Sequence, residues 1–298
     1  MKKTLILIAG PTAVGKTKLS IDLSKNLNCP IISCDSRQFY KGMDIGTAKP
    51  TKEELNAAPH YFIDTLEVEE EYTAGMFEQD ALQKIQELFQ DSDQVIMVGG
   101  STLYIDAITK GFDDLPKDLK LRNNLIELSQ AQGIEVLLEE LKEKDPEYFQ
   151  EVDRSNAVRI QRAIEVIRLS GQKYSELRKG IEKTRDFDIL KIVLDDERED
   201  LYERINARVD QMIQEGLEEE ARSFYDKRGL TALKTVGYQE FFDCFDGKTT
   251  REEAIELIKR NSRRYAKRQL TWFRRDPDYH WFSPQQFSAV YELIQSQI

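Results

Sequence analysis

The residues with the clearest chemical meaning form a short stretch near the N-terminus. Gly10–Thr17 reads GPTAVGKT and matches the pattern GxxxxGK[ST] in full. Its glycines let the backbone curl so that successive N–H groups point at an anion, and a helix starting near Lys16 adds the positive end of its dipole. Lys16 supplies a full charge, and the Thr17 hydroxyl is suited to ligate Mg²⁺. The stretch predicts a site for a di- or triphosphate, ATP included, although a glycine-rich turn with nothing bound has the same spacing. The predicted anion-binding residues are Gly10, Pro11, Thr12, Ala13, Val14, Gly15, Lys16 and Thr17.

A second group of polar residues follows the apolar run PIISC at 30–34, where Asp35 stands beside Ser36, Arg37 and Gln38. In open α/β sheets, ligand groups gather at the carboxyl ends of strands. A carboxylate at Asp35 could accept a proton from a substrate amine or hydroxyl, and Gln38 could bond a base edge. Asp35 could equally be a helix cap or the first residue of an Asx-turn.

These residues need a sheet to hold them. Short apolar runs at Thr4–Ala9, 30–34 and Val95–Val98 predict buried strands, and apolar residues at helical spacing predict helices at 16–27 and 73–90. This alternation favours an α/β fold, with a P-loop core whose parallel sheet is flanked by helices.

The alternation of predicted strands and helices ends after residue 111. No convincing strand lies between Asp113 and Gly180, and DILKIVL at 188–194 returns to strand character. We therefore expect an all-helical insertion at 113–184 between two parts of the core, 1–112 and 185–298. Within the insertion, helices are expected at 118–132, 136–144, 146–150 and 155–170. Beyond it, we expect helices at 197–227 and 251–275, a strand at 279–282 and a terminal helix.

Composition narrows the function classes. The 298 residues include 54 acidic and 43 basic ones, a formal charge of −11, which argues against a protein that coats nucleic acid all over. Three cysteines without a CxxC pair and two isolated histidines exclude a disulfide framework and disfavour a structural zinc site or a Ser-His-Asp triad. The N-terminal apolar run is too short for a signal peptide or a membrane span. We expect a cytoplasmic monomer with no membrane partner.

One segment departs from the acidic composition. Between Lys259 and Arg275 there are eight basic residues and no acidic one. A cationic stripe on an acidic protein is the footprint expected for an RNA backbone, although the same arginines could pair with carboxylates. The residues expected to contact RNA are Arg263, Arg264, Lys267 and Arg268.

Several longer motifs make the pattern specific. GPTAVGKT is followed by CDSRQFYKGMDIGTAKP (34–50), PHYFID (59–64) and VGGSTLY (98–104), and then by RIQRAIEVIRLSGQ (159–172), KTVGYQE (234–240) and NSRRYAKRQLTWFR (261–274). Together they resemble the tRNA dimethylallyltransferase family, over residues 6 to about 275. DIGTAKP at this distance after a phosphate loop is much more discriminating than the loop itself.

The resemblance implies transfer of a dimethylallyl group from dimethylallyl diphosphate to the exocyclic amine of the adenosine 3′ of the anticodon in tRNA. Gly10–Thr17 would cradle the diphosphate, while Lys16 and Mg²⁺, held by Thr17, would neutralise the leaving group. Asp35 would be the general base, which weakly basic adenine needs as the new bond forms. Ser101 stands where the family usually has threonine and would contact the base or the diphosphate. A cap of the following helix explains Ser101 as well.

The resemblance also implies contacts with the tRNA anticodon stem-loop. Arg159 would bind tRNA and could also hold the diphosphate, although Arg159 and Arg162 could instead form an exposed ion-paired face. Arg122 and Asn123 lie at the start of the insertion. Asn123 is the weaker candidate of the two, because an uncharged residue cannot neutralise phosphate. The implied tRNA-binding residues are Asp35, Ser36, Arg37, Gln38, Ser101, Arg122, Asn123, Arg159, Ile160, Gln161, Arg162, Ala163, Lys234, Thr235, Val236, Gly237, Tyr238 and Gln239, besides the basic stripe.

Three other functions fit parts of the pattern. A P-loop small-molecule kinase shares the core but leaves DIGTAKP and the basic stripe unexplained. An RNA-binding ATPase or switch module explains the stripe but not Asp35. A transferase that prenylates free AMP or ADP fits the donor chemistry, whereas the helical insertion and the stripe favour a macromolecular acceptor.

Overall fold

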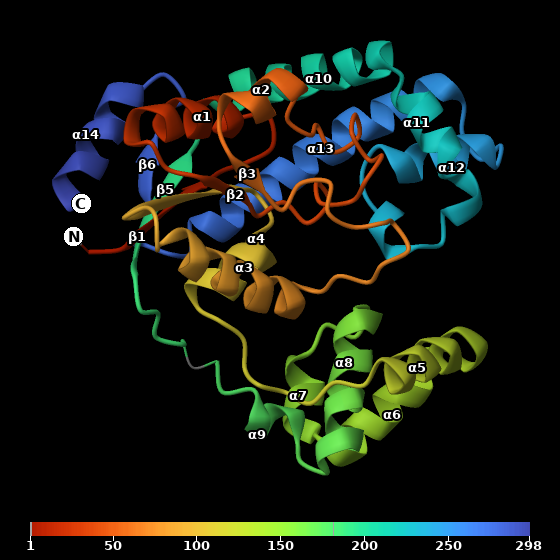
Figure 1. Cartoon of the computed structure of the whole chain (residues 1–298). Coiled ribbons are helices and arrows are strands. Elements are labelled where there is room, and N and C mark those ends of the chain that lie inside the picture. The colour runs from red at the N-terminus through yellow and green to blue at the C-terminus, as the bar shows by residue number, and fades with distance from the viewer. Residues whose placement is uncertain (1, 181) are drawn as a thin grey trace. The chain divides into compact units, whose positions relative to one another are not determined.

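The computed structural model describes residues 2–180 and 182–298, and the chain divides into two compact units (Figure 1). The first combines Met1–Thr109 with Arg185–Ile298, and the second is Lys110–Thr184. Within the described residues, no helix combines the length and the apolar character that crossing a membrane requires.

The first unit is built on a parallel sheet, as the sequence predicts. Its strand order is β3-β2-β4-β1-β5-β6 over the described residues. All six residues of β1 are buried, because helices cover both faces of the sheet. The strands are β1 (Thr4–Ala9), β2 (Ile31–Ser33), β3 (His60–Tyr61), β4 (Gln94–Gly99), β5 (Asp188–Leu194) and β6 (His280–Phe282).

Alternate residues of β1 feed two separate cores. Leu5 and Leu7 belong to a large cluster with residues of α3, α4, α12 and α13, whereas Ile6 and Ile8 pack with residues of α1, α10 and α14. This alternation is the period of a strand covered on both faces. The helices of this unit are α1 (Lys16–Leu27), α2 (Lys52–Ala57), α3 (Ala74–Leu88), α4 (Thr102–Thr109), α10 (Arg198–Glu215), α11 (Leu217–Ser223), α12 (Tyr238–Phe245), α13 (Arg251–Phe273) and α14 (Phe287–Gln297).

The structure corrects one predicted helix. The segment 197–227 was expected to be continuous, but it is divided into α10, α11 and a 3₁₀ turn at Tyr225–Lys227. Gly216 has φ +103°, a left-handed conformation that ends α10 and turns the chain into α11. The break matters because α10 and α11 contribute different residues to the cavities described below.

The described elements of the second unit are helices. It contains α5 (Leu119–Gln132), α6 (Glu135–Lys144), α7 (Pro146–Glu151), α8 (Ala157–Ser170) and α9 (Tyr174–Leu177). Its own apolar core includes Leu125, Leu141 and Ile164, all fully buried. Buried Asp145 caps α7 by accepting from the Tyr148 N–H and also accepts two hydrogen bonds from Ser175.

Candidate active site at the carboxyl ends of the strands

The loop between β1 and α1 has the shape that its sequence predicts. Gly10 has φ +148°, and a Cβ there would lie 2.6 Å from the Leu194 carbonyl oxygen, so glycine is needed. Gly15, with φ +99°, precedes the first turn of α1. The Lys16 ammonium folds over the loop and donates to the carbonyls of Gly10 (3.0 Å) and Pro11 (2.7 Å).

Two cations and one carboxylate set the electrostatics of this loop. Burial, and then the charge of Arg208, lower the pKa of Lys16 to about 8, while Asp35 opposes them. Burial also lowers the pKa of Arg208, again opposed by Asp35. Arg208 Nη1 donates to the Thr12 hydroxyl at 3.3 Å. Burying like charges together is costly, and an anion bound between them would relieve that cost.

Gln269 of α13 ties the loop to the end of β4. Its Oε1 accepts from the Thr12 N–H (3.0 Å) and its Nε2 donates to the Gly100 carbonyl (2.7 Å). The side chain is buried, and a Cβ at Gly100 would lie 2.2 Å from Nε2. Both ends of the amide are therefore fixed by main-chain groups, and the amide fixes the loop in return.

Asp35 lies two residues beyond the end of β2 at Ser33. Its Oδ1 accepts from the Arg37 N–H at 2.9 Å, which is the Asx-turn that the sequence left open. The neighbouring Ser36 N–H donates to the Ser101 hydroxyl at 2.8 Å, so Ser101 holds the residue after Asp35. The Ser101 carbonyl accepts the first hydrogen bonds of α4.

Two cavities meet at Asp35. The phosphate-loop cavity, of about 470 Å³, is lined by the loop residues Thr12–Thr17 and by Ser33 and Gln38. The Lys234 cavity, of about 380 Å³, is lined by Lys234–Gly237 and Gln239. The residues that line both are Thr12, Ala13, Asp35, Thr47, Arg208 and Tyr265. A carboxylate is thus available to groups bound in either cavity.

Tyr265 of α13 belongs to this shared wall. Burial and then the charge of Asp35 raise the pKa of its phenol to about 12, so the hydroxyl keeps its proton at neutral pH. The Arg268 guanidinium lies 5.7 Å from the centre of the ring. Tyr265, which stands between basic residues of the sequence, therefore lines both cavities.

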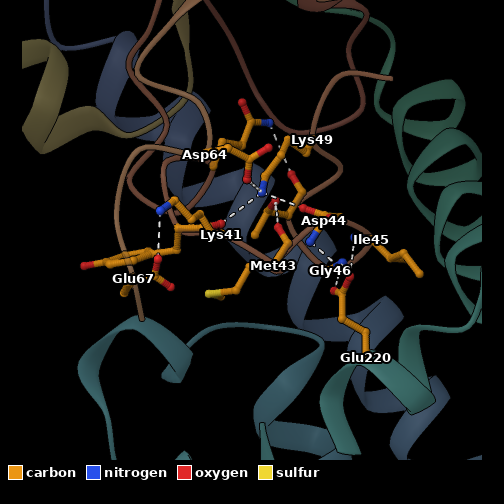
Figure 2. Close-up of polar contacts among 12 residues, drawn as sticks. Lys41, Met43, Asp44, Ile45, Gly46, Lys49, Asp64, Glu67 and Glu220 are labelled. Carbon is orange, nitrogen blue, oxygen red and sulfur yellow. Dashed lines mark hydrogen bonds and ion pairs between the residues drawn. The ribbon is translucent and has the colours of Figure 1, made fainter. Parts of the chain in front are cut away.

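The DIGTAKP segment borders both cavities and is held by polar contacts. Lys49 is almost fully buried and bonds the Tyr40 carbonyl (2.9 Å), Asp44 (2.6 Å) and Asp64 (Figure 2). The Gln38 amide is engaged as well, because Nε2 donates to the carbonyls of Thr47 and Ala48 and Oε1 accepts from Ser33. Gln38, predicted to bond a base, thus holds this segment in place.

In the second unit, two of the predicted tRNA-binding arginines are paired. Arg122 and Arg162 both bind Glu165, at 3.0 Å and 2.8 Å, and Glu165 is fully buried. Burial raises the pKa of Glu165, but the Asp118 N–H and the two guanidinium groups outweigh it and lower the pKa overall. Exposed Arg159 and Asn123 remain predicted tRNA contacts.

Four predicted contacts need correction. The side chains of Ile160, Gln161 and Ala163 are buried within the second unit, and Tyr238 is fully buried in the first. Their burial follows from the apolar face that each helix turns to its own core. Tyr238 does adjoin segments that line the Lys234 cavity, but its side chain does not reach the solvent.

The basic stripe is mostly open to solvent. Among the described residues, exposed Arg260, Arg264, Lys267 and Arg275 form no ion pair. Lys259 pairs with Asp210 at 2.7 Å, and Arg263 donates to Asn206. In the part of the chain that the structure describes, carboxylates pair with Lys259 and Arg274, so the alternative of an ion-paired helix holds for only part of the stripe.

Three polar residues of the phosphate-loop cavity were not predicted from the sequence: Arg204, Arg208 and Gln269. Arg204 pairs with Asp196, yet its Nε is buried without a hydrogen-bond partner among the described residues. Arg204 and Arg208 are four residues apart on α10, a spacing that places both on one helix face. That spacing was the one available signal, and it becomes informative only once α10 is known to border the loop.

Comparisons with known proteins agree with this geometry. The family model described as IPP transferase matches residues 38–276. The chain is 46% identical over 296 residues to tRNA dimethylallyltransferase 2 of Parabacteroides distasonis, covering 99% of each chain, and 48% identical over 300 residues to tRNA dimethylallyltransferase of Christiangramia forsetii, covering 100% of this chain and 99% of the relative.

Solved structures agree as well. The tRNA isopentenylpyrophosphate transferase of Bacillus halodurans is 39% identical, with a TM-score of 0.73 over 99% of this chain and 97% of that chain. A eukaryotic dimethylallyltransferase acting on tRNA is 28% identical, with a TM-score of 0.80 over 96% of this chain and 75% of that one.

Proposed function

The chain belongs to the IPP transferase family, and from this premise we propose that it transfers a dimethylallyl group from dimethylallyl diphosphate to tRNA. The acceptor is the exocyclic amine of the adenosine immediately 3′ of the anticodon, and diphosphate is released. The observation that carries the proposal is the position of Asp35 on the wall shared by two cavities, one lined by a phosphate loop and the other by Lys234–Gly237.

The phosphate-loop cavity suits the diphosphate of the donor. Loop N–H groups and the start of α1 favour an anion, and Lys16 and Arg208 add positive charge beside Arg204, which pairs with Asp196. When the bond between the allylic carbon and the diphosphate oxygen breaks, negative charge grows on that oxygen. N–H groups and cations that are fixed in place before the reaction stabilise this charge more than they stabilise bound dimethylallyl diphosphate. Such electrostatic stabilisation of the transition state is commonly a dominant catalytic term.

Asp35 suits the other half of the reaction. The adenine nitrogen forms a bond to the allylic carbon, the carbon–oxygen bond breaks, and the proton of the amine must leave. Asp35 takes that proton, so the product amine is neutral and the diphosphate leaves with the electron pair of the broken bond. Because Asp35 lines both cavities, it can reach the junction where the donor carbon and the acceptor nitrogen would meet.

Mg²⁺ fits this site through the donor rather than through a protein cage. Within the described residues, no group of three or more His, Cys, Asp or Glu could hold a metal ion. Thr17 lines the cavity, and Mg²⁺ characteristically binds one or two protein groups together with phosphate oxygens and water. The ion would neutralise charge on the diphosphate.

The basic stripe and the Lys234 cavity suit the tRNA. Exposed arginines and lysines of α13 would contact the phosphates of the anticodon stem-loop. A cavity of about 380 Å³ admits a base only after that base leaves the loop stack, so we expect the target adenosine to be extruded. Since tRNA is the acceptor, we expect the protein to act in the cytoplasm.

A labelling assay tests the proposal. Labelled dimethylallyl diphosphate, Mg²⁺ and unmodified tRNA are combined with the protein, and free AMP, ATP and common kinase acceptors are tried in parallel. We expect label in the anticodon arm of tRNA and none in free nucleotide. Label in AMP alone, or phosphate transfer from ATP to a small molecule, would contradict the proposal.

A further inference from the structure

One carboxylate behind the Lys234 cavity accepts four hydrogen bonds. Glu220 of α11 accepts from the main-chain N–H groups of Asp44 (3.0 Å) and Ile45 (2.8 Å) at Oε2, and from Gly46 (2.8 Å) at Oε1 (Figure 2). Its Oε1 also accepts from the Tyr238 hydroxyl at 2.6 Å. A run of three N–H groups is an anion-binding arrangement, and here the protein supplies the anion.

The four donors come from two segments that are far apart in the sequence. Asp44, Ile45 and Gly46 belong to the DIGTAKP segment, whereas Tyr238 follows Gly237 at the start of α12. A Cβ at Gly46 would lie 2.5 Å from the Tyr238 ring, so the two segments touch directly. Both also line the Lys234 cavity, through Gly46 and Thr47 on one side and Lys234–Gly237 on the other.

Only a carboxylate satisfies this set of donors. Glutamine has a single acceptor oxygen, and its NH₂ group would face two of the four donors at short range. Burial first, and then the charge and hydrogen bond of Glu220, raise the pKa of Tyr238, so its hydroxyl stays protonated and donates. Charge-assisted hydrogen bonds of this kind are about twice as strong as neutral ones.

We propose that Glu220 is a positioning residue for the tRNA acceptor, because its carboxylate fixes two walls of the Lys234 cavity against each other. The inference rests on the proposed function, in which that cavity receives the target base. It predicts that substitution of Glu220 impairs the use of tRNA much more than the binding of dimethylallyl diphosphate. In the phosphate loop, Lys16 and Thr12 are held by contacts that do not involve Glu220.

The test compares E220Q with Y238F and with the control E219Q, whose site is exposed on the same helix. For E220Q, which loses two hydrogen bonds, kcat/KM for tRNA should fall about 10- to 100-fold. For Y238F, which loses one, it should fall about 3- to 10-fold. The Kd of dimethylallyl diphosphate, measured without tRNA, should change less than about twofold. E219Q should behave as the wild type does.

Two further readouts separate positioning from general stability. Hydrogen exchange of the amides at 44–46 should accelerate in E220Q, while that of β1 amides stays unchanged. The double variant E220Q/Y238F should lose less than the product of the two single effects, because both substitutions remove hydrogen bonds of the same carboxylate. Unchanged kcat/KM in E220Q and Y238F, or donor affinity falling in step with tRNA use, would overturn the inference. Since wild type is assayed alongside, its failure to label tRNA would instead refute the proposed function.

Discussion

Lys16 should make donor binding depend on pH. In the free protein, burial and Arg208 lower its pKa to about 8 from an ordinary 10.5. Below pH 8 the ammonium is already present when the diphosphate arrives, whereas above pH 8 binding must also take up a proton. A bound diphosphate adds negative charge beside Lys16 and raises its pKa. Donor affinity should therefore be greatest below about pH 8 and fall as the pH rises through that value.

The size of the effect follows from the shifted pKa. At about pH 7 roughly nine-tenths of the free protein carries a charged Lys16, and at about pH 9 roughly one-tenth does. If the donor binds only the charged form, its Kd weakens by about tenfold between these two conditions, and binding at about pH 9 takes up about 0.9 proton. Because the folded pKa lies below the unfolded one, charged Lys16 also destabilises the free protein below pH 8, and this effect is relieved between pH 8 and 10.5.

Calorimetry of donor binding in two buffers of different ionisation enthalpy measures both quantities. K16M removes the group and reports any titration of the donor itself, and K18M removes an exposed lysine of the same helix. We expect K18M to keep the pH dependence and K16M to lose it, with weaker binding at every pH. A wild type that takes up no proton between pH 7 and 9, or a K16M that keeps the same slope, would refute the reasoning.

Three other expectations follow from the site. Asp35→Asn should lower kcat by roughly 10²–10⁴-fold while leaving donor and tRNA affinity nearly unchanged, and a parallel loss of tRNA affinity would make Asp35 a binding residue instead. Gln269→Leu should lower the free energy of unfolding by about 2–4 kcal/mol in urea titrations, because a main-chain N–H and a carbonyl lose their partners; an unchanged midpoint would contradict this. Charge reversal at Arg264 and Lys267 should weaken tRNA binding and reduce the slope of log Kd against log salt by about 2, and an unchanged slope would place the RNA elsewhere.

The sequence predicts the central strands well because their environment is uniform. β1 and β5 are apolar runs covered on both faces, and the structure places them at the predicted residues, Thr4–Ala9 and Asp188–Leu194. The edge strand β3 was not predicted, since His60 and Tyr61 carry no periodic signal over two residues. Gly216 was read as part of a continuous helix because a single glycine within a helical pattern is often tolerated.

Some residues of the candidate site can be predicted from the local sequence, whereas others are placed there by tertiary packing. The phosphate loop and Asp35 are recognisable because each follows its strand within a few residues. Arg208 and Gln269 lie on α10 and α13, hundreds of residues after Thr12, and they reach the loop only through the packing of these helices. Gln269 carries no local sequence signal, and the spacing of Arg204 and Arg208 becomes informative only once α10 is known to border the loop.

The walls of the Lys234 cavity show how such remote residues could control the acceptor. Three of the segments that line it are each held from behind by a polar side chain: Ser36 by Ser101, Gly46 by Glu220, and Gly237 by Glu240 at 2.8 Å. Ser101, Glu220 and Glu240 are not themselves among the residues that line the cavity. Substitutions at these positions can therefore reshape the acceptor site while the phosphate loop keeps its own anchors, Lys16 and Gln269. The binding of each substrate can accordingly change without the other, although one carboxylate, Asp35, lines both cavities.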